Sequence, residues 1–122
     1  MLKLIDFGDS RIIEPNEIYS TCIGTINYMS PEMLRERTGN EIKKSDMWSI
    51  GVITFILITG RLPFHGHTTI QTLNKIKTGD YNYPKKQNIS SKCKDFIDKL
   101  LILDTNKRMS CNEALNHEWI RK

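Results

Sequence analysis

An almost unbroken apolar stretch in the middle of the chain most strongly restricts its fold. From Ile50 to Ile58 the sequence reads Ile-Gly-Val-Ile-Thr-Phe-Ile-Leu-Ile, and its one polar side chain is a threonine. A helix that is apolar nearly all round is buried on all sides, because no face of it prefers water. The stretch is too short to span a bilayer, which takes about 20 residues. We therefore expect a buried helix over residues 45–58, ended by Thr59-Gly60, at the centre of a helical domain.

Two further helices and one strand are predicted in the first two thirds of the chain. Pro31 suits the first position of a short helix that runs through about Arg37, and the polar Thr38-Gly39-Asn40 then stops it. Another helix has its apolar residues at helical spacing over 70–76. The β-prone residues 2–5 predict one short strand at the N-terminus.

The last third predicts two more helices. Ser90 is an N-cap for a helix whose apolar positions fall at i, i+3, i+4, i+7 and i+8. Ser110 and Glu113 have the spacing of a capping box, and the helix that they open directs Trp119 toward the core. Residues 8–24, in contrast, show no sustained period. The fold class is therefore mainly α, with a central helix, one strand and a long irregular segment.

Bulk composition excludes several classes of protein. The 122 residues allow one domain with a modest core, and the net charge of +4 comes from scattered basic residues without interleaved aromatics. We therefore expect no nucleic-acid partner. The three cysteines form neither a CxxC pair nor a cluster with metal-ligand spacing, which fits a reducing compartment. No leader-like segment opens the chain, so we expect a cytoplasmic protein without a membrane partner.

Several short motifs follow one another in a fixed order. They are Asp6-Phe7-Gly8, then Gly24-Thr25 through Ser30-Pro31-Glu32, then Asp46-Met47-Trp48-Ser49-Ile50-Gly51, then Gly60 with Pro63-Phe64, and finally Asp104 four residues before Arg108. A lone Asp-Phe-Gly is weak evidence, because a tripeptide recurs by chance. The combined order, however, resembles the protein kinase family over essentially all 122 residues.

The resemblance implies that residues 1–122 form the C-terminal lobe of a kinase domain, with an activation segment over residues 6–32. The stretches at 59–64 and 117–120 look most like the calcium/calmodulin-dependent and calcium-dependent group. Thr25 matches the threonine of serine/threonine-specific enzymes. The implied activity is transfer of the ATP γ-phosphate to serine or threonine side chains of protein substrates.

The same resemblance assigns roles within the activation segment. Asp6 corresponds to the carboxylate that holds Mg²⁺ across the phosphates of the nucleotide, since a hard cation takes oxygen ligands. Phe7 would pack against residues that report the active state, and Gly8 would permit rotation of the backbone. Thr21 lies where many kinases carry an activating phosphothreonine, which adds charge that pairs with arginines. Thr25 would hydrogen-bond the catalytic aspartate of an intact enzyme.

Outside that segment the implied roles are structural. Glu32 and Arg108 correspond to a buried ion pair that ties the activation segment to the last helices, because a planar guanidinium matches a carboxylate bidentately. Asp46 normally accepts hydrogen bonds from the catalytic-loop backbone. Trp48 is expected in the core.

Other parts of the kinase motif set do not occur in the 122 residues. There is no glycine-rich nucleotide loop, no strand lysine for the phosphates and no His-Arg-Asp catalytic loop. We therefore expect no catalytic residue here and no phosphotransfer by this chain alone. ATP and Mg²⁺ would bind the intact parent and not bind tightly to these residues. Expected partners are the parent's protein substrates, with a regulatory segment or the missing N-terminal lobe as further candidates.

The alternative is a non-catalytic docking or decoy module. A helix that normally packs against absent upstream helices would expose apolar residues between 50 and 57, and such a patch predicts a partner or aggregation. Two departures from the family pattern also matter. Ser30 replaces the usual alanine, and Asp9 places a second carboxylate near the metal position.

Overall fold

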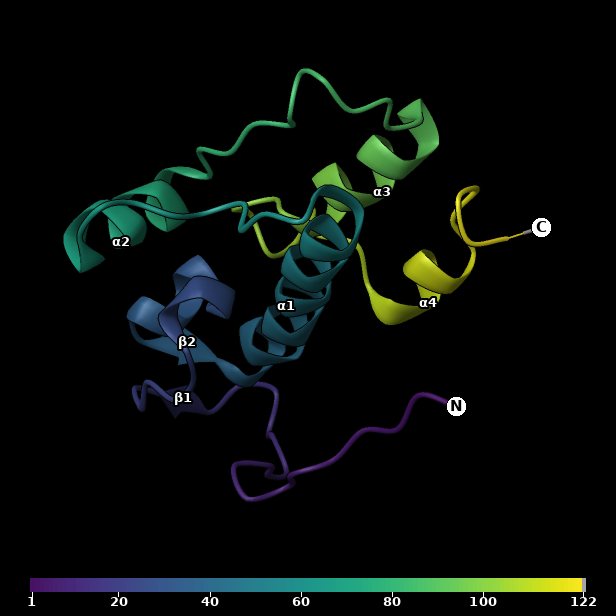
Figure 1. The fold of residues 1–122 in the computed structure, drawn as a ribbon. Coiled ribbons are helices and arrows are strands. Elements are labelled where there is room, and N and C mark those ends of the chain that lie inside the picture. The colour runs from purple at the N-terminus through teal and green to yellow at the C-terminus, as the bar shows by residue number, and fades with distance from the viewer. Residues whose placement is uncertain (122) are drawn as a thin grey trace.

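A long helix forms the axis of the molecule, and the shorter elements lie on both sides of it (Figure 1). The structure is a computed structural model that describes residues 1–121, so Lys122 of the predicted domain lies outside the described residues. In chain order the elements are β1 (Ile18–Tyr19), 3₁₀ helices at Ile26–Tyr28 and Pro31–Leu34, β2 (Arg37–Thr38), α1 (Gly39–Thr59), α2 (Thr69–Thr78), α3 (Ser91–Leu100) and α4 (Cys111–Leu115). The prediction of a mainly α fold is confirmed.

Helix α1 starts earlier than the sequence pattern suggested. Its N-cap is Thr38, whose hydroxyl accepts the Glu41 backbone N–H at 3.4 Å while the Thr38 N–H donates to the Glu41 carboxylate at 2.8 Å. This capping box means that residues 38–40 open a helix instead of stopping one, so that prediction was wrong. The predicted end is confirmed, because Gly60 adopts a left-handed φ of 71° and caps the helix.

The core lies between α1 and α3. Trp48 of α1 stacks on Phe64 with ring centroids 5.2 Å apart, and both side chains are buried. A Cβ at Gly51 would lie 2.8 Å from the Cβ of Leu100, which is too close. Glycine at position 51 therefore lets the two helices approach closely. Trp119 follows α4, is partly buried, and packs against Phe96 with centroids 5.1 Å apart.

The opposite face of α1 is open. Ile50, Ile53 and Leu57 are 42%, 47% and 79% exposed, and they recur at helical spacing along one stripe. The expectation that this helix is buried on all sides is therefore wrong for these described residues. Its physical basis, an apolar surface all round the helix, is correct, but no other described element covers the stripe.

The strand prediction also needs correction. Residues 2–5 form no strand and are exposed, since a strand needs a hydrogen-bonded partner and none lies beside them. The small sheet is instead the antiparallel pair β1–β2, with Ile18 opposite Thr38 and Tyr19 opposite Arg37. The predicted helix from Pro31 to Arg37 is only a 3₁₀ helix ending at Leu34, because Arg37 is taken into this strand pair.

The remaining helices agree with their sequence signals. Gly79 ends α2 with a left-handed φ of 66°. Ser90 accepts the Cys93 N–H at 3.2 Å, and Ser110 forms a capping box with Glu113 at the start of α4. No helix within the described part of the chain has both the length and the apolar character needed to cross a membrane.

Candidate functional site

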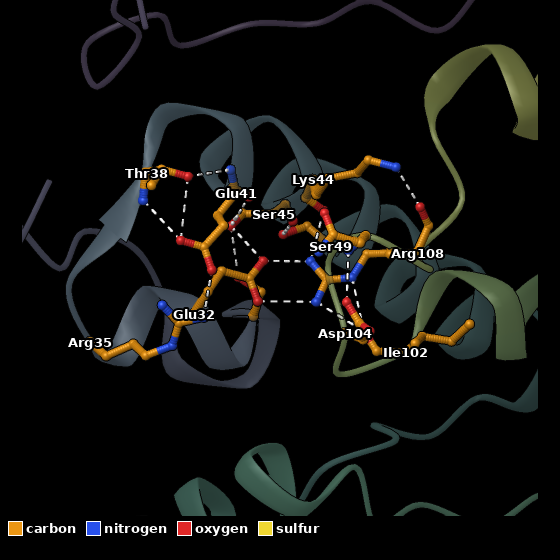
Figure 2. A network of polar contacts seen from close by, with 12 residues as sticks. Glu32, Arg35, Thr38, Glu41, Lys44, Ser45, Ser49, Ile102, Asp104 and Arg108 are labelled. Carbon is orange, nitrogen blue, oxygen red and sulfur yellow. Dashed lines mark hydrogen bonds and ion pairs between the residues drawn. The ribbon is translucent and has the colours of Figure 1, made fainter. Parts of the chain in front are cut away.

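A buried ion pair links two segments that are far apart in the sequence. Glu32 of the second 3₁₀ helix and Arg108 of the loop before α4 are 1% and 0% exposed. The guanidinium meets the carboxylate bidentately: Nη1 donates to Oε1, and Nη2 donates to Oε2 at 3.0 Å (Figure 2). This arrangement fixes both the distance and the orientation of the two segments.

The rest of the Arg108 side chain is also fully bonded. Nε and Nη2 each donate to the Ile102 carbonyl at 3.0 Å, and Nη1 donates to the Lys44 carbonyl at 2.9 Å. All five N–H groups of the guanidinium therefore have an acceptor. The guanidinium also lies over the Trp48 ring, 5.0 Å from its centroid, which adds a cation–π contact.

Two serines extend the pair on the Glu32 side. Ser45 of α1 donates its hydroxyl to Glu32 Oε1 at 2.8 Å, and Ser30 donates its hydroxyl to Ser45 Oγ at 2.9 Å. All three side chains are buried. Ser30 is therefore a member of the buried network, where an alanine would make no hydrogen bond.

The network keeps Glu32 ionised. Burial alone raises the pKa of this carboxyl, but the hydrogen bonds and the positive charge of Arg108 outweigh burial, and the Ser45 hydroxyl adds to their effect. The pKa of Glu32 therefore lies below its ordinary value. We call the Glu32–Arg108 ion pair the brace. Both of its side chains are charged and hydrogen-bonded, so it is a structural link and not a proton donor.

The Asp6-Phe7-Gly8 motif lies apart from this brace on the exposed N-terminal stretch. Asp6 has φ of 62° and is the one non-glycine residue with positive φ between residues 1 and 121. Ser10 then closes a turn, because its N–H and its hydroxyl both donate to the Phe7 carbonyl. Phe7 is exposed. A Cβ at Gly8 would make only an ordinary contact, 3.5 Å from Asp6 Oδ1.

A hollow of about 390 Å³ brings together three residues that the sequence singled out. Asp9, Thr25 and Asp46 all line it, from the N-terminal stretch, the first 3₁₀ helix and α1. The carboxylate of Asp46 accepts no hydrogen bond from the described residues, and partial burial raises its pKa. Thr25 likewise forms no side-chain hydrogen bond at this cap position.

Thr21 is exposed, but its backbone carbonyl accepts a hydrogen bond from a buried side chain. The Arg37 guanidinium donates to the Thr21 carbonyl through Nη2. Arg37 itself is only 1% exposed. The structure thus places a buried arginine against the Thr21 backbone. None of the sequence motifs includes position 37.

A family model described as Protein kinase domain matches residues 1–120. The chain belongs to the protein kinase domain family. It is 43% identical over 122 residues to myosin light chain kinase A of Dictyostelium discoideum, a match that covers 98% of this chain and 41% of that protein. It is 41% identical over 123 residues to calcium-dependent protein kinase 4 of Plasmodium berghei, which covers 99% of this chain and 23% of that protein.

The solved structures agree with this assignment to the kinase domain. The twitchin kinase region from C. elegans aligns with a TM-score of 0.83 at 35% identity, over 98% of this chain and 21% of that one. The predicted resemblance to serine/threonine kinases, calcium-dependent ones included, is therefore confirmed. The chain spans less than half the length of each of these proteins.

This part of a kinase domain contains no all-protein metal cluster within residues 1–121. That finding is compatible with Mg²⁺ as a ligand of Asp6, since Mg²⁺ is commonly held by one or two carboxylates together with substrate phosphates. The left-handed turn places Asp6 on an exposed loop, where its oxygens are free of other described groups.

Sequence reasoning missed several residues that the structure brings into the site. Ser45 and Lys44 were assigned no role, yet Ser45 bonds Glu32 and Lys44 Nζ donates to the Arg108 carbonyl at 2.5 Å. The unusual Ser30 was a usable signal for the serine pair. Arg37 had no signal, because its burial depends on the strand pair.

Proposed function

We propose that residues 1–122 are part of a serine/threonine protein kinase that transfers the γ-phosphate of ATP to serine or threonine side chains of proteins. The observation that carries the proposal is the buried Glu32–Arg108 brace, which is the pairing that the kinase motifs imply. The brace joins the Ser-Pro-Glu end of the 6–32 segment to the loop before α4. Segment 6–32 is accordingly the activation segment of the domain.

Asp6 is proposed as a Mg²⁺ ligand. A left-handed conformation is uncommon for a non-glycine residue and draws attention to the position, and Asp6 adopts it with a φ of 62°. When bound, Mg²⁺ would neutralise charge on the transferring phosphoryl group. The chain's own contribution is to present the Asp6 carboxylate on a turn closed by Ser10.

Residues 1–122 alone are proposed to be inactive. Position 6 offers one carboxylate, whereas phosphoryl transfer also needs groups that hold the phosphates and orient the accepting hydroxyl. The hollow beside Asp46 and Thr25 supports this view, because neither side chain has a hydrogen-bond partner there. Those partners would come from a catalytic loop. The proposed location is the cytoplasm, which the three free cysteines support.

A docking or decoy module is the second candidate. It is favoured by one observation, the open apolar stripe of Ile50, Ile53 and Leu57 on α1, which is the kind of surface that binds a partner. In that case the brace and the core would be retained for binding only.

The size of the native product distinguishes the two candidates. An immunoblot with an antibody against residues 85–100 should reveal a product of kinase-domain length or more. Mass spectrometry of the protein that this antibody captures should find a peptide that contains His-Arg-Asp. A product near 14.2 kDa would instead support the docking module.

A phosphotransfer assay completes the test. The purified native protein should label a serine/threonine peptide from ATP with Mg²⁺, and Asp6→Asn should abolish this labelling while leaving the melting temperature unchanged. Residues 1–122 alone should give only background labelling. Mg²⁺-dependent labelling by residues 1–122 would overturn the proposed inactivity.

A further inference from the structure

The start of α1 serves as a platform for the 6–32 segment. We call residues 37–40 the seat. The Gly39 N–H donates to the Glu17 carbonyl at 3.1 Å, and the Asn40 N–H donates to the Pro15 carbonyl at 3.1 Å. The β1–β2 pair adds the contact of residues 18–19 with residues 37–38. First-turn N–H groups of a helix otherwise lack a partner within the helix, so the segment satisfies donors of α1.

Gly39 allows the segment to lie directly on the seat. A Cβ at this position would be 1.9 Å from the carbonyl oxygen of Glu14 and 2.7 Å from Cγ2 of Ile13. The nearest atom belongs to the backbone and cannot rotate away as a side chain would. Any larger residue at position 39 would therefore displace residues 13–14.

Arg37 is the residue of the seat that reaches furthest along the segment. Its Nη2 donates to the Thr21 carbonyl, and its Nη1 donates to the Arg35 carbonyl at 3.0 Å. Nε is buried without a hydrogen-bond partner, and no ion pair with Arg37 is found within the described residues. The acceptors of this buried cation are thus neutral carbonyls.

Such an arrangement is costly for stability. Burial lowers the pKa of Arg37, and the positive charge of Arg11 lowers it further. The negative charge of Glu32 attracts the Arg37 guanidinium, but the Glu32 carboxylate accepts its hydrogen bonds from Arg108 and not from Arg37. A buried cation without a carboxylate partner is destabilising. Simple replacement by an apolar residue would remove this cost, so fold stability alone does not explain the arginine.

We propose that Arg37 is a positioning residue that holds the Thr21–Cys22 part of the activation segment on the seat. This inference rests on the proposed function in treating residues 6–32 as an activation segment. Because the acceptor is the main-chain carbonyl of Thr21, the hold requires neither a particular side chain at position 21 nor a phosphate on it. Arg37 therefore keeps this part of the segment in place in the unmodified protein.

Amide exchange at the seat tests the proposal without any assay of activity. In the natural protein, Arg37→Met should speed exchange of the Gly39 and Asn40 amides about tenfold, because the segment carbonyls that accept them move away. Exchange in α3 should stay unchanged. Arg35→Met is the matched control, since Arg35 is exposed and bonds Glu41 instead of the segment; it should leave both amides protected. Arg37→Lys should restore part of the protection.

Thiol labelling provides a second measurement in the same variants. Cys22 follows Thr21 and is an exposed residue, but its thiol lies 3.5 Å from the Met29 sulfur in a partly buried contact. Release of the segment should break this contact and speed labelling of Cys22 severalfold. Cys111 is exposed elsewhere and should label at an unchanged rate, while the buried Cys93 reports unfolding. If Cys93 is labelled rapidly in Arg37→Met, that variant is unfolded, and the comparison is then made with Arg37→Lys.

Thr21→Ala tests whether Arg37 holds the segment through the backbone or through the side chain of Thr21. It should leave the exchange of Gly39 and Asn40 and the labelling of Cys22 unchanged. If Thr21→Ala or phosphatase treatment loosens the seat as much as Arg37→Met does, or if Arg37→Met leaves the seat protected, the proposal is overturned.

In the active kinase, Arg37→Met should raise the KM for a protein substrate about tenfold without changing the KM for ATP. Loss of all phosphotransfer with an intact seat would contradict the proposed function and not this inference.

Discussion

Two fully buried arginines in this chain have opposite surroundings. Arg108 uses all five N–H groups, two of them on the Glu32 carboxylate. Arg37 uses two carbonyls and has no carboxylate partner within the described residues. Burial removes water from both cations, so only the partners differ. The fully paired Arg108 stabilises the junction between segments, whereas Arg37 holds a segment at a cost to stability.

The Glu32–Arg108 brace makes stability depend on pH. The pKa of Glu32 is lower in the folded protein than its ordinary value. Its contribution to stability is therefore fully present above the ordinary glutamate pKa of 4.5 and is lost as the pH falls through the lower folded pKa. Glu32→Gln should destabilise the protein by about 3–5 kcal/mol at pH 7 because it leaves Arg108 buried and unpaired. Urea denaturation at several pH values between 7 and 3 measures this effect.

The difference between the original protein and Glu32→Gln should shrink as the pH falls, since Glu32 itself becomes neutral. Glu36→Gln is the matched control, because Glu36 is exposed and should behave like the original protein at every pH. A difference that stays constant from pH 7 to pH 3 would mean that the charge of Glu32 does not stabilise the brace.

At the scale of elements, local hydrogen bonds decide where α1 begins. Thr38 and Glu41 satisfy each other's backbone N–H groups, and Glu41 also accepts from Arg35 at 2.6 Å. The cap therefore connects the strand pair, the helix and the loop that carries Arg35. An extended residue followed directly by a helix is possible here because the cap supplies the acceptors that the first turn lacks.

Removal of this cap should lower stability by an amount typical of N-caps. Thr38→Ala should cost about 1 kcal/mol, read as a lower urea midpoint with an unchanged slope. Thr38→Ser keeps the hydroxyl acceptor and should lose much less. Equal destabilisation by Ala and Ser would show that the methyl group of Thr38, rather than its hydroxyl, stabilises this position.

At the scale of the whole molecule, the described chain has a core on one side of α1 and an open apolar stripe on the other. Trp48 and Val52 face the core, whereas Ile50, Ile53 and Leu57 face away from it. Exposed apolar stripes of this kind promote association. Their burial would lower the free energy by about 25 cal/mol for each Å² of apolar surface removed from water.

Residues 1–122 in isolation should therefore associate with themselves as their concentration rises. The double variant Ile53→Gln with Leu57→Gln should be more nearly monomeric by light scattering after size exclusion. Ile70→Gln is the matched control, because Ile70 is an isolated exposed apolar residue on α2 and its change should not alter association. Equal association of the double variant and the original chain would exclude this stripe as the contact.

The sequence alone predicted much of the helical framework and the family. The caps at Ser90 and Ser110 and the glycine stops at Gly60 and Gly79 act within one turn of the chain, so local patterns reveal them. The motif order pointed to a protein kinase because several spaced motifs rarely coincide by chance. The apolar character of α1 was likewise evident from residues 50–58.

Only the tertiary structure decided which surfaces are covered and which distant residues meet. It left residues 2–5 without a strand partner, paired residues 18–19 with 37–38, and opened one face of α1. It also buried Ser30, Ser45 and Arg37 at contacts between segments. Strand pairing and burial depend on what lies opposite a residue in space, and a local pattern contains no information about that neighbour.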